Sequence, residues 1–194
     1  MKTKKLTICA LCLALITIGA FIKIPLPYFD YVTLQYFFVM MSGMLLGSTL
    51  GATVVGIYLF AGLLGLPIFA AGGGISYLLR PTFGFLLGFL PAVWVSGKIV
   101  EHGKRQDIKT GLLSASSALI ITYTIGLVYK YLILRFYTKT GINWEIILLS
   151  VFPLQLPKDI AFTILAGLAY PTLPNMLRMY APSRKQHLSK VSEI

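Results

Sequence analysis

The chain has 194 residues, of which 57% are hydrophobic and only 12% are charged. Soluble domains carry about 25% charged residues, so this composition excludes an ordinary soluble globular protein and indicates a membrane protein. The net charge of +11 does not predict nucleic-acid binding, because the basic residues lie in short segments between apolar stretches rather than in one basic stripe.

The first apolar stretch runs without a charge from Leu6 to Ile22 and follows three lysines. This arrangement fits the start of a signal peptide, but its length and the apolar stretches after it favour a retained transmembrane helix over residues 6–23. Ala10 and Ala14 lie four residues apart on one face of this helix. Small residues at this spacing let a second helix approach closely, and that helix belongs either to this protein or to a partner.

The next apolar stretch extends from Tyr31 to Leu79 without a charged residue, after a proline-containing loop at 23–31. About twenty helical residues cross a bilayer core, so this stretch is long enough for two spans and a turn. We expect the turn at 47–51, between spans over 33–49 and 51–68. Glycine is frequent in both spans, which favours close antiparallel packing.

Residues 65–74 contain a proline and end in Gly72, Gly73 and Gly74, so they cannot continue a regular helix. Irregular backbone at membrane depth is tolerated only where it is buried in protein or lines a cavity. The segment is therefore either an external loop or a re-entrant wall of a pocket. Tyr77 and Arg80 follow it, and Pro81 suits the start of a fourth span.

The remaining chain alternates between water and membrane. We predict spans over 82–99, 111–135 and 157–178, with aqueous loops at 98–109 and 136–145. Residues 146–156 are too short to span and are expected to lie along the outer surface. The predicted fold is an all-α integral membrane protein with six transmembrane helices, a single domain over residues 1–194 in contact with membrane lipid.

The orientation follows from the distribution of lysine and arginine. Six spans place both termini and the 98–109 loop on one side, and this side holds most of the seventeen basic residues. The positive-inside rule therefore predicts cytoplasmic termini in a multi-pass protein of the cell membrane. In this orientation Lys158 and Asp159 occupy the outer end of the last span, on the same side as residues 23–31 and 65–81.

The sequence has no nucleotide-binding GxxxxGK[ST] motif, no HExxH, no GxSxG with suitable partners and no cluster with metal-ligand spacing. We therefore expect no enzymatic activity, no cofactor, no resident metal and no ATP hydrolysis by this chain. The outer residues instead suit a binding pocket for a small ligand with a carboxylate. Arg80 has the shape for a bidentate carboxylate contact, and Lys158 offers a point charge.

Simpler interpretations of these charged residues stay open. Lys158 and Asp159 also fit an interfacial helix start with a favourable local charge pattern. Arg80 also fits a loop residue that extends its charge to the membrane surface.

Four motifs together resemble a known family, the BioY biotin transporters. The motifs are Val32-Thr-Leu-Gln35, Gly62-Leu-Leu-Gly-Leu-Pro-Ile-Phe-Ala-Ala-Gly-Gly-Gly74, Pro81-Thr-x-Gly84-Phe-Leu-Leu-Gly-Phe89 and Pro157-x-Asp159. The resemblance covers residues 6–178. Members of the family are substrate-binding (S) components of energy-coupling factor (ECF) transporters, which belong to the ABC class.

The resemblance implies high-affinity biotin binding and biotin uptake driven by a separate module. This module comprises a transmembrane coupling protein and two cytoplasmic ATPases, which agrees with the missing nucleotide-binding motif. An AxxxA-type face on the first helix of such S components docks on the coupling protein, and Ala10 and Ala14 match it. The alternative function is an ion-coupled secondary transporter of a small carboxylate-bearing vitamin, and an intramembrane enzyme that acts on biotin precursors is a further open class.

One departure from the family concerns the last motif, which usually reads Pro-Gly-Asp with a lysine three residues after the aspartate. Here Lys158 replaces the glycine and Phe162 replaces the lysine. Positions 158 and 162 lie one turn apart on the same helix face, so a lysine at 158 can still reach the same pocket.

The resulting hypothesis assigns the parts of biotin to separate residues. Either Arg80 or Lys158 pairs with the carboxylate. The ureido ring bonds to Asp159 and Gln35, Tyr77 and Phe69 cover the apolar body, and Gly72, Gly73 and Gly74 permit close backbone approach.

Overall fold

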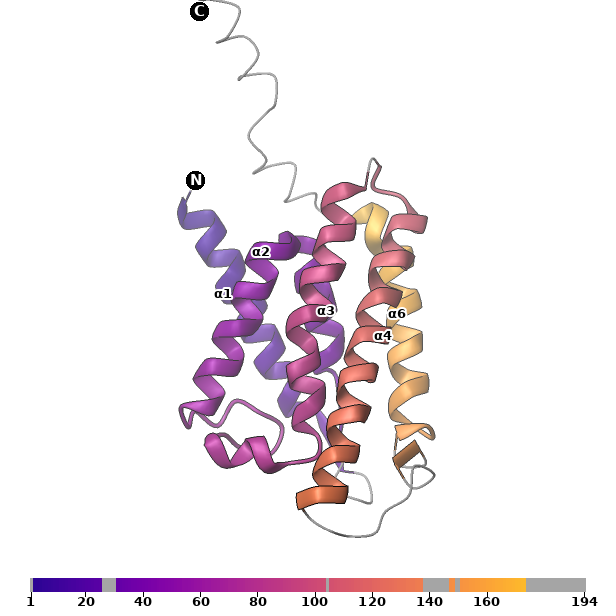
Figure 1. The fold of residues 1–194 in the computed structure, drawn as a ribbon. Helices are drawn as coiled ribbons and strands as arrows, with labels where there is room; N and C mark the ends of the chain where they lie inside the picture. The colour runs from indigo at the N-terminus through magenta and orange to yellow at the C-terminus, as the bar shows by residue number, and fades with distance from the viewer. Residues whose placement is uncertain (1, 26–30, 104, 138–146, 149–150, 174–194) are drawn as a thin grey trace, which may run out of the picture.

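The computed structural model describes residues 2–25, 31–103, 105–137, 147–148 and 151–173. Its long helices run side by side in one bundle (Figure 1). They are α1 (Lys2–Phe21), α2 (Gln35–Leu63), α3 (Phe83–His102), α4 (Ile108–Leu132) and α6 (Gln155–Ala169). The short elements are the strands β1 (Lys23–Pro25) and β2 (Tyr31–Thr33), the 3-10 helices η2 (Ile75–Leu79) and η4 (Tyr170–Thr172), and the π-helix η3 (Ile133–Tyr137).

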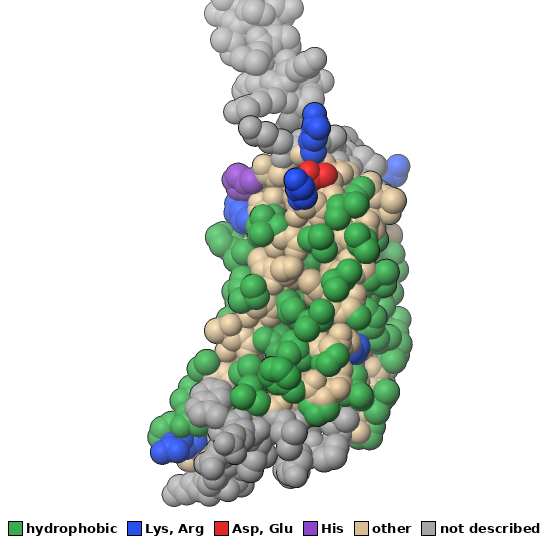
Figure 2. Space-filling model, turned by 90° about the vertical axis from the view of Figure 1, so that its right-hand side faces the viewer, with side chains coloured by type: hydrophobic (Ala, Val, Ile, Leu, Met, Phe, Trp, Pro, Cys, Tyr) green, Lys and Arg blue, Asp and Glu red, His purple; other side chains and the backbone are tan. Residues whose placement is uncertain are grey.

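Four of the described helices are long and apolar enough to cross a membrane, namely α1, α2, α3 and α4 with η3. The face formed by α4 and α6 exposes large apolar side chains, including Ile120, Ile164 and Leu168. Figure 2 shows hydrophobic side chains spread over most of this face, with most of the visible charged side chains near the upper end and a few elsewhere. An all-helical membrane protein is thus confirmed, apart from the small β1–β2 hairpin in the predicted loop 23–31.

Helix α2 is a hairpin of two arms rather than one straight helix. Gly47 interrupts it with a φ of 79°, a left-handed conformation that favours glycine. A Cβ placed on Gly51 would lie 3.2 Å from the Cα of Gly43, whereas eight residues of straight helix span about 12 Å. The chain therefore reverses at Gly47, within the turn predicted at 47–51.

The end of α3 holds this hairpin closed. The carboxylate of Glu101 accepts hydrogen bonds from the backbone N–H of Ser48 at 2.7 Å and from its hydroxyl at 2.9 Å. Ser48 begins the second arm of α2, where N–H groups lack helical partners and negative charge is favourable. Glu101 therefore caps the second arm from a neighbouring helix.

The bundle has two distinct ends (Figure 1). One end carries the N-terminus, the Gly47 turn and the α3–α4 link, in which Asp107 caps α4 by accepting from the N–H of Thr110 at 2.9 Å. Hydrogen bonds from Thr110 hold the pKa of the Asp107 carboxyl below its usual range. The opposite end carries the β1–β2 hairpin, η2 and the start of α6. The structure thus brings residues 23–25, 65–81 and 158–159 to one end, as the sequence predicts.

The close contact between α3 and the α2 hairpin gives a stability prediction. A Cβ on Gly97 would lie 2.2 Å from the backbone nitrogen of Ser48, whereas a Cβ on Gly56 would meet nothing nearer than 3.9 Å. We expect Gly97→Ala to lower the free energy of unfolding by about 1–3 kcal/mol, because the backbone itself must move. Gly56→Ala should be neutral or slightly stabilising. Thermal unfolding in detergent measures both, and equal unfolding temperatures would contradict this packing.

Candidate ligand-binding site

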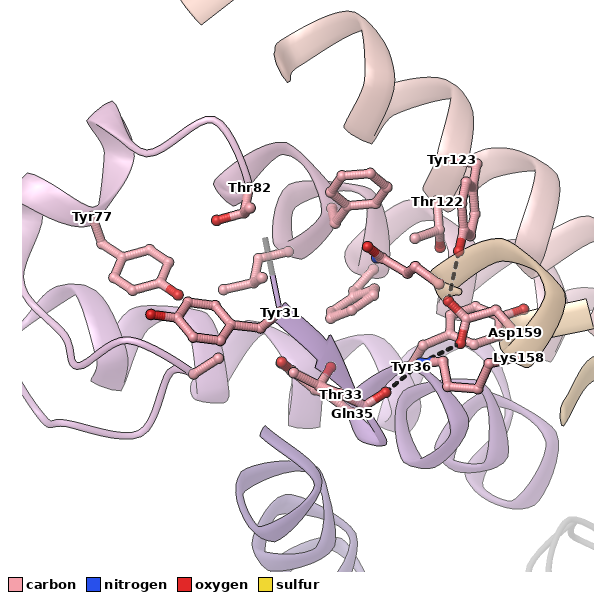
Figure 3. Close-up of a pocket in the computed structure, with 15 residues that line it drawn as sticks. Tyr31, Thr33, Gln35, Tyr36, Tyr77, Thr82, Thr122, Tyr123, Lys158 and Asp159 are labelled. Atoms are coloured by element: carbon pink, nitrogen blue, oxygen red, sulfur yellow. Dashed lines mark hydrogen bonds and ion pairs between the residues drawn. The ribbon is translucent and has the colours of Figure 1, made fainter. Parts of the chain in front are cut away.

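A cavity of about 570 Å³, including its open mouth, lies among β2, the first arm of α2, α3, α4 and the start of α6 (Figure 3). The lining residues are Tyr31, Thr33, Gln35, Tyr36, Ala70, Tyr77, Thr82, Phe85, Leu86, Phe89, Thr122, Tyr123, Gln155, Lys158 and Asp159. The lining thus combines apolar and aromatic walls with a few polar and charged groups, as ligand pockets commonly do.

An ion pair between a half-buried lysine and a buried aspartate forms the charged wall of the cavity. Lys158 Nζ lies 2.8 Å from Asp159 Oδ1, and the Asp159 side chain is 2% exposed. Tyr123 donates a hydrogen bond to Asp159 Oδ2 at 2.7 Å, and Lys158 also donates to the carbonyl oxygen of Thr33. As Figure 3 shows, these contacts join residues of α4, α6 and β2. A single ammonium and a single tyrosine thus hold the carboxylate in one orientation.

The next turn of α6 extends this network away from the charges. Thr163 donates to the backbone carbonyl of Asp159 at 2.7 Å, and its hydroxyl lies 3.2 Å from that of Tyr36. These bonds connect α6 to the first arm of α2. They fix the backbone around Asp159 as well as its side chain.

Three buried polar atoms in the cavity wall make no hydrogen bond within the described residues, namely Gln35 Nε2, Thr122 Oγ1 and Asp159 Oδ1. Most buried polar side-chain atoms in proteins have at least one partner. Asp159 Oδ1 is ion-paired with Lys158, and the Gln35 side chain interacts with the Tyr58 hydroxyl. The Thr122 hydroxyl is therefore the polar group of these three that is available to a bound molecule.

Aromatic rings form the other wall of the cavity. Tyr77 and Tyr31 lie together at this side in Figure 3, and the Tyr77 ring packs against Phe69 with centroids 4.7 Å apart. Arg80 places its guanidinium 5.3 Å from the Tyr77 ring centroid. Lys23 donates to the carbonyl oxygen of Ala70, which ties β1 to the segment before η2.

Four of the predicted site residues line the cavity, namely Gln35, Tyr77, Lys158 and Asp159. Arg80 is exposed and lies against Tyr77 rather than in the cavity lining. Phe69 is fully buried behind Tyr77, in contact with the backbone of Gly62. A ligand contact by Arg80 or Phe69 stays a prediction.

The predicted glycines also lie outside the cavity lining, and the structure gives them a local role. Gly72 and Gly74 have φ values of 107° and 100°, which other residues rarely adopt. A Cβ on Gly73 would lie 2.1 Å from the carbonyl oxygen of Leu66. The glycines therefore shape the segment that carries Tyr77, and their contact with a ligand stays a prediction.

No sequence pattern indicated the contribution of α3 and α4 to the cavity. Tyr123 and Thr122 supply polar groups, while Phe85, Leu86 and Phe89 supply apolar ones. These residues lie in long uncharged stretches, where one tyrosine or threonine does not differ in pattern from a packing residue. Only the position of Asp159 opposite α4 reveals their role.

The other predicted surface lies on α1. Ala10 and Ala14 are both exposed, as are Leu6 at 73% and Leu11 at 58%. Among the described residues, this small-residue face therefore does not serve packing within the protein. It remains open to lipid or to another protein.

Comparison with known proteins identifies the family. The family model described as BioY family matches residues 1–179. The chain belongs to the BioY family. The probable biotin transporter BioY of Lysinibacillus sphaericus is 36% identical over 177 residues, covering 91% of this chain and 90% of the relative. The biotin transporter BioY of Rhodobacter capsulatus is 32% identical over 190 residues, covering 93% of this chain and 96% of the relative.

A solved structure supports the same assignment. The S-component for biotin from an ECF-type ABC transporter, solved by crystallography at 2.1 Å, matches with a TM-score of 0.73 and 26% identity over 93% of each chain. The resemblance stated from sequence motifs is thus confirmed. BioY relatives are transporters, which also confirms that this chain is not an enzyme.

The bond between Tyr123 and Asp159 gives a second stability prediction. Removing the buried hydroxyl with Tyr123→Phe leaves one carboxylate oxygen without its donor, and we expect a loss of about 1.5–3 kcal/mol in unfolding free energy. Tyr137→Phe is the matched control, because Tyr137 is 57% exposed. In the Asp159→Asn background the effect of Tyr123→Phe should shrink. Additive losses would contradict a direct interaction.

Proposed function

We propose that this BioY-family protein binds biotin from outside the cell and serves as the S component of an ECF-type ABC transporter. The observation that carries the proposal is the cavity at Asp159, which sits in a fold similar to the S-component for biotin. A buried carboxylate accepts N–H donors, and adjacent aromatic rings suit an apolar body. A cyclic urea with an aliphatic tail matches both features.

The proposed placement of biotin separates its two polar ends. Its ureido ring lies at Asp159 and Gln35, and its tail extends toward Tyr77. Lys158 already contacts Asp159 and the carbonyl of Thr33, whereas Arg80 makes no ion pair within the described residues and is exposed. We therefore favour Arg80 over Lys158 as the partner of the carboxylate, since a guanidinium can bind it in a bidentate manner.

The proposed topology has six membrane crossings and cytoplasmic termini. The two arms of the α2 hairpin account for two crossings, and α6, with its exposed apolar face, accounts for the last. The end with the N-terminus also carries Lys98, Arg105 and Lys109, which supports its cytoplasmic location by the positive-inside rule. The biotin cavity then opens at the outer end.

The proposed partners are a transmembrane coupling protein and two cytoplasmic ATPase subunits. The exposed Ala10 and Ala14 support α1 as the docking helix, because small residues allow a partner helix to approach closely. Such a partner would supply the energy for uptake, since the sequence contains no nucleotide-binding motif of its own.

Binding measurements on charge variants test the site. We expect Asp159→Asn to weaken biotin binding about 100-fold, because a carboxylate forms stronger hydrogen bonds with N–H donors than an amide does. Arg80→Ala should weaken it about tenfold through loss of the carboxylate contact. Calorimetry of the purified protein measures both, with Arg105→Ala at the opposite end as the control. Affinities within a factor of two of wild type for both would overturn this assignment.

Uptake measurements test the docking face. The double substitution Ala10→Trp and Ala14→Trp should leave biotin binding unchanged but abolish uptake and co-purification of the coupling protein, because large rings prevent close helix approach. Ile164→Trp, on the exposed face of α6, is the control and should retain both uptake and co-purification of the coupling protein. If uptake persists in the double variant, α1 is not the docking helix. If an ionophore stops uptake without lowering ATP, ion-coupled transport replaces the ECF proposal.

A further inference from the structure

Thr122 is an exception among the buried helix hydroxyl groups in the described part of the chain. The hydroxyls of Thr17, Thr53 and Thr163 each donate to the carbonyl four residues earlier in their own helix. Such bonds are the usual solution for a threonine within a helix. Thr122 is 2% exposed, yet its hydroxyl makes no hydrogen bond within the described residues.

The position of Thr122 is well defined despite this missing partner. A Cβ on Gly88 of α3 would lie 3.0 Å from both the Cα and the carbonyl oxygen of Thr122, so the two helices are in close contact here. Tyr123, the next residue, is committed to Asp159. Figure 3 shows Thr122 and Tyr123 beside one another at the Asp159 end of the cavity. The unpartnered hydroxyl is therefore held at a fixed place in the cavity wall.

The groups around the Thr122 hydroxyl define which ligand groups this part of the cavity can recognise. The Asp159 carboxylate, when ionised, only accepts hydrogen bonds, while the Thr122 hydroxyl can donate one. The Tyr123 hydroxyl proton is already used on Asp159, so Tyr123 offers no competing donor. A carboxylate beside a free donor complements a ligand group in which N–H stands next to a carbonyl oxygen, as in a cyclic urea or amide.

We propose that Thr122 is a specificity-determining residue whose hydroxyl donates to the carbonyl oxygen of the ligand's urea group. This inference rests on the proposed biotin binding and deepens it. The ligand's N–H groups bond to Asp159, and its carbonyl bonds to Thr122. A ligand without that carbonyl leaves the buried hydroxyl unpaired and binds less tightly.

Three variants separate the hydroxyl from the shape of the side chain. Thr122→Val keeps the shape and removes the hydroxyl, and we expect about tenfold weaker biotin binding. Thr122→Ser keeps the hydroxyl and should stay within about threefold of wild type. Thr17→Val is the matched control, because the Thr17 hydroxyl is satisfied within α1 and lies outside the cavity lining. Calorimetry or ligand competition gives the affinities.

A stability measurement excludes a merely structural role. The ligand-free Thr122→Val protein should unfold at the wild-type temperature or above, because the substitution removes an unpaired buried polar group. A lowered unfolding temperature with unchanged biotin affinity would overturn the inference.

The same experiment distinguishes this inference from the proposed function. If the wild-type protein does not bind biotin, the proposed function is wrong and the inference fails with it. If the wild type binds biotin and Thr122→Val binds it within a factor of two, only the role of Thr122 is wrong.

Discussion

The ion pair between Lys158 and Asp159 is the interaction on which the candidate site depends. Removing the Asp159 charge from water is costly, and such a pair persists only with good geometry and further hydrogen bonds. Here Tyr123 supplies a bond from α4, and the carbonyl of Thr33 supplies one from β2. The pair therefore joins three separate parts of the chain around the cavity, and the same contacts set the direction of the carboxylate.

The surrounding scaffold gives this pair a fixed location. The α2 hairpin turns at Gly47 and is capped by Glu101, so its first arm lies firmly beside α3. That arm carries Gln35 and Tyr36, two residues of the cavity lining. Close helix packing near Gly97 and Gly88 thus determines where the polar groups of the cavity meet. A membrane protein has little hydrophobic driving force between helices, so close packing and hydrogen bonds matter more than in a soluble bundle.

The cavity combines polar groups that are paired within the protein, called committed below, with polar groups that are unpaired, called uncommitted. Asp159 is ion-paired with Lys158 and hydrogen-bonded by Tyr123, while the hydroxyl of Thr122 is buried without a hydrogen-bond partner in the described part of the chain. Committed groups hold the geometry of the site in the absence of ligand. Uncommitted groups lose little when a ligand arrives, because they have no internal bond to break. This division suits tight binding of a small polar head such as the proposed urea.

The sequence by itself determined the membrane class, the turn near Gly47, the family and the convergence of Gln35, Tyr77, Lys158 and Asp159 at one end of the bundle. These features produce local signals: long uncharged stretches, glycine, ordered motifs and a charge pair in apolar surroundings. Only the tertiary structure placed Thr122 and Tyr123 opposite Asp159, and Arg80 and the glycines 72–74 outside the cavity lining. The physical reason is that an uncharged helix gives no sequence signal for which face meets a cavity, since that depends on the rotation and packing of its neighbours.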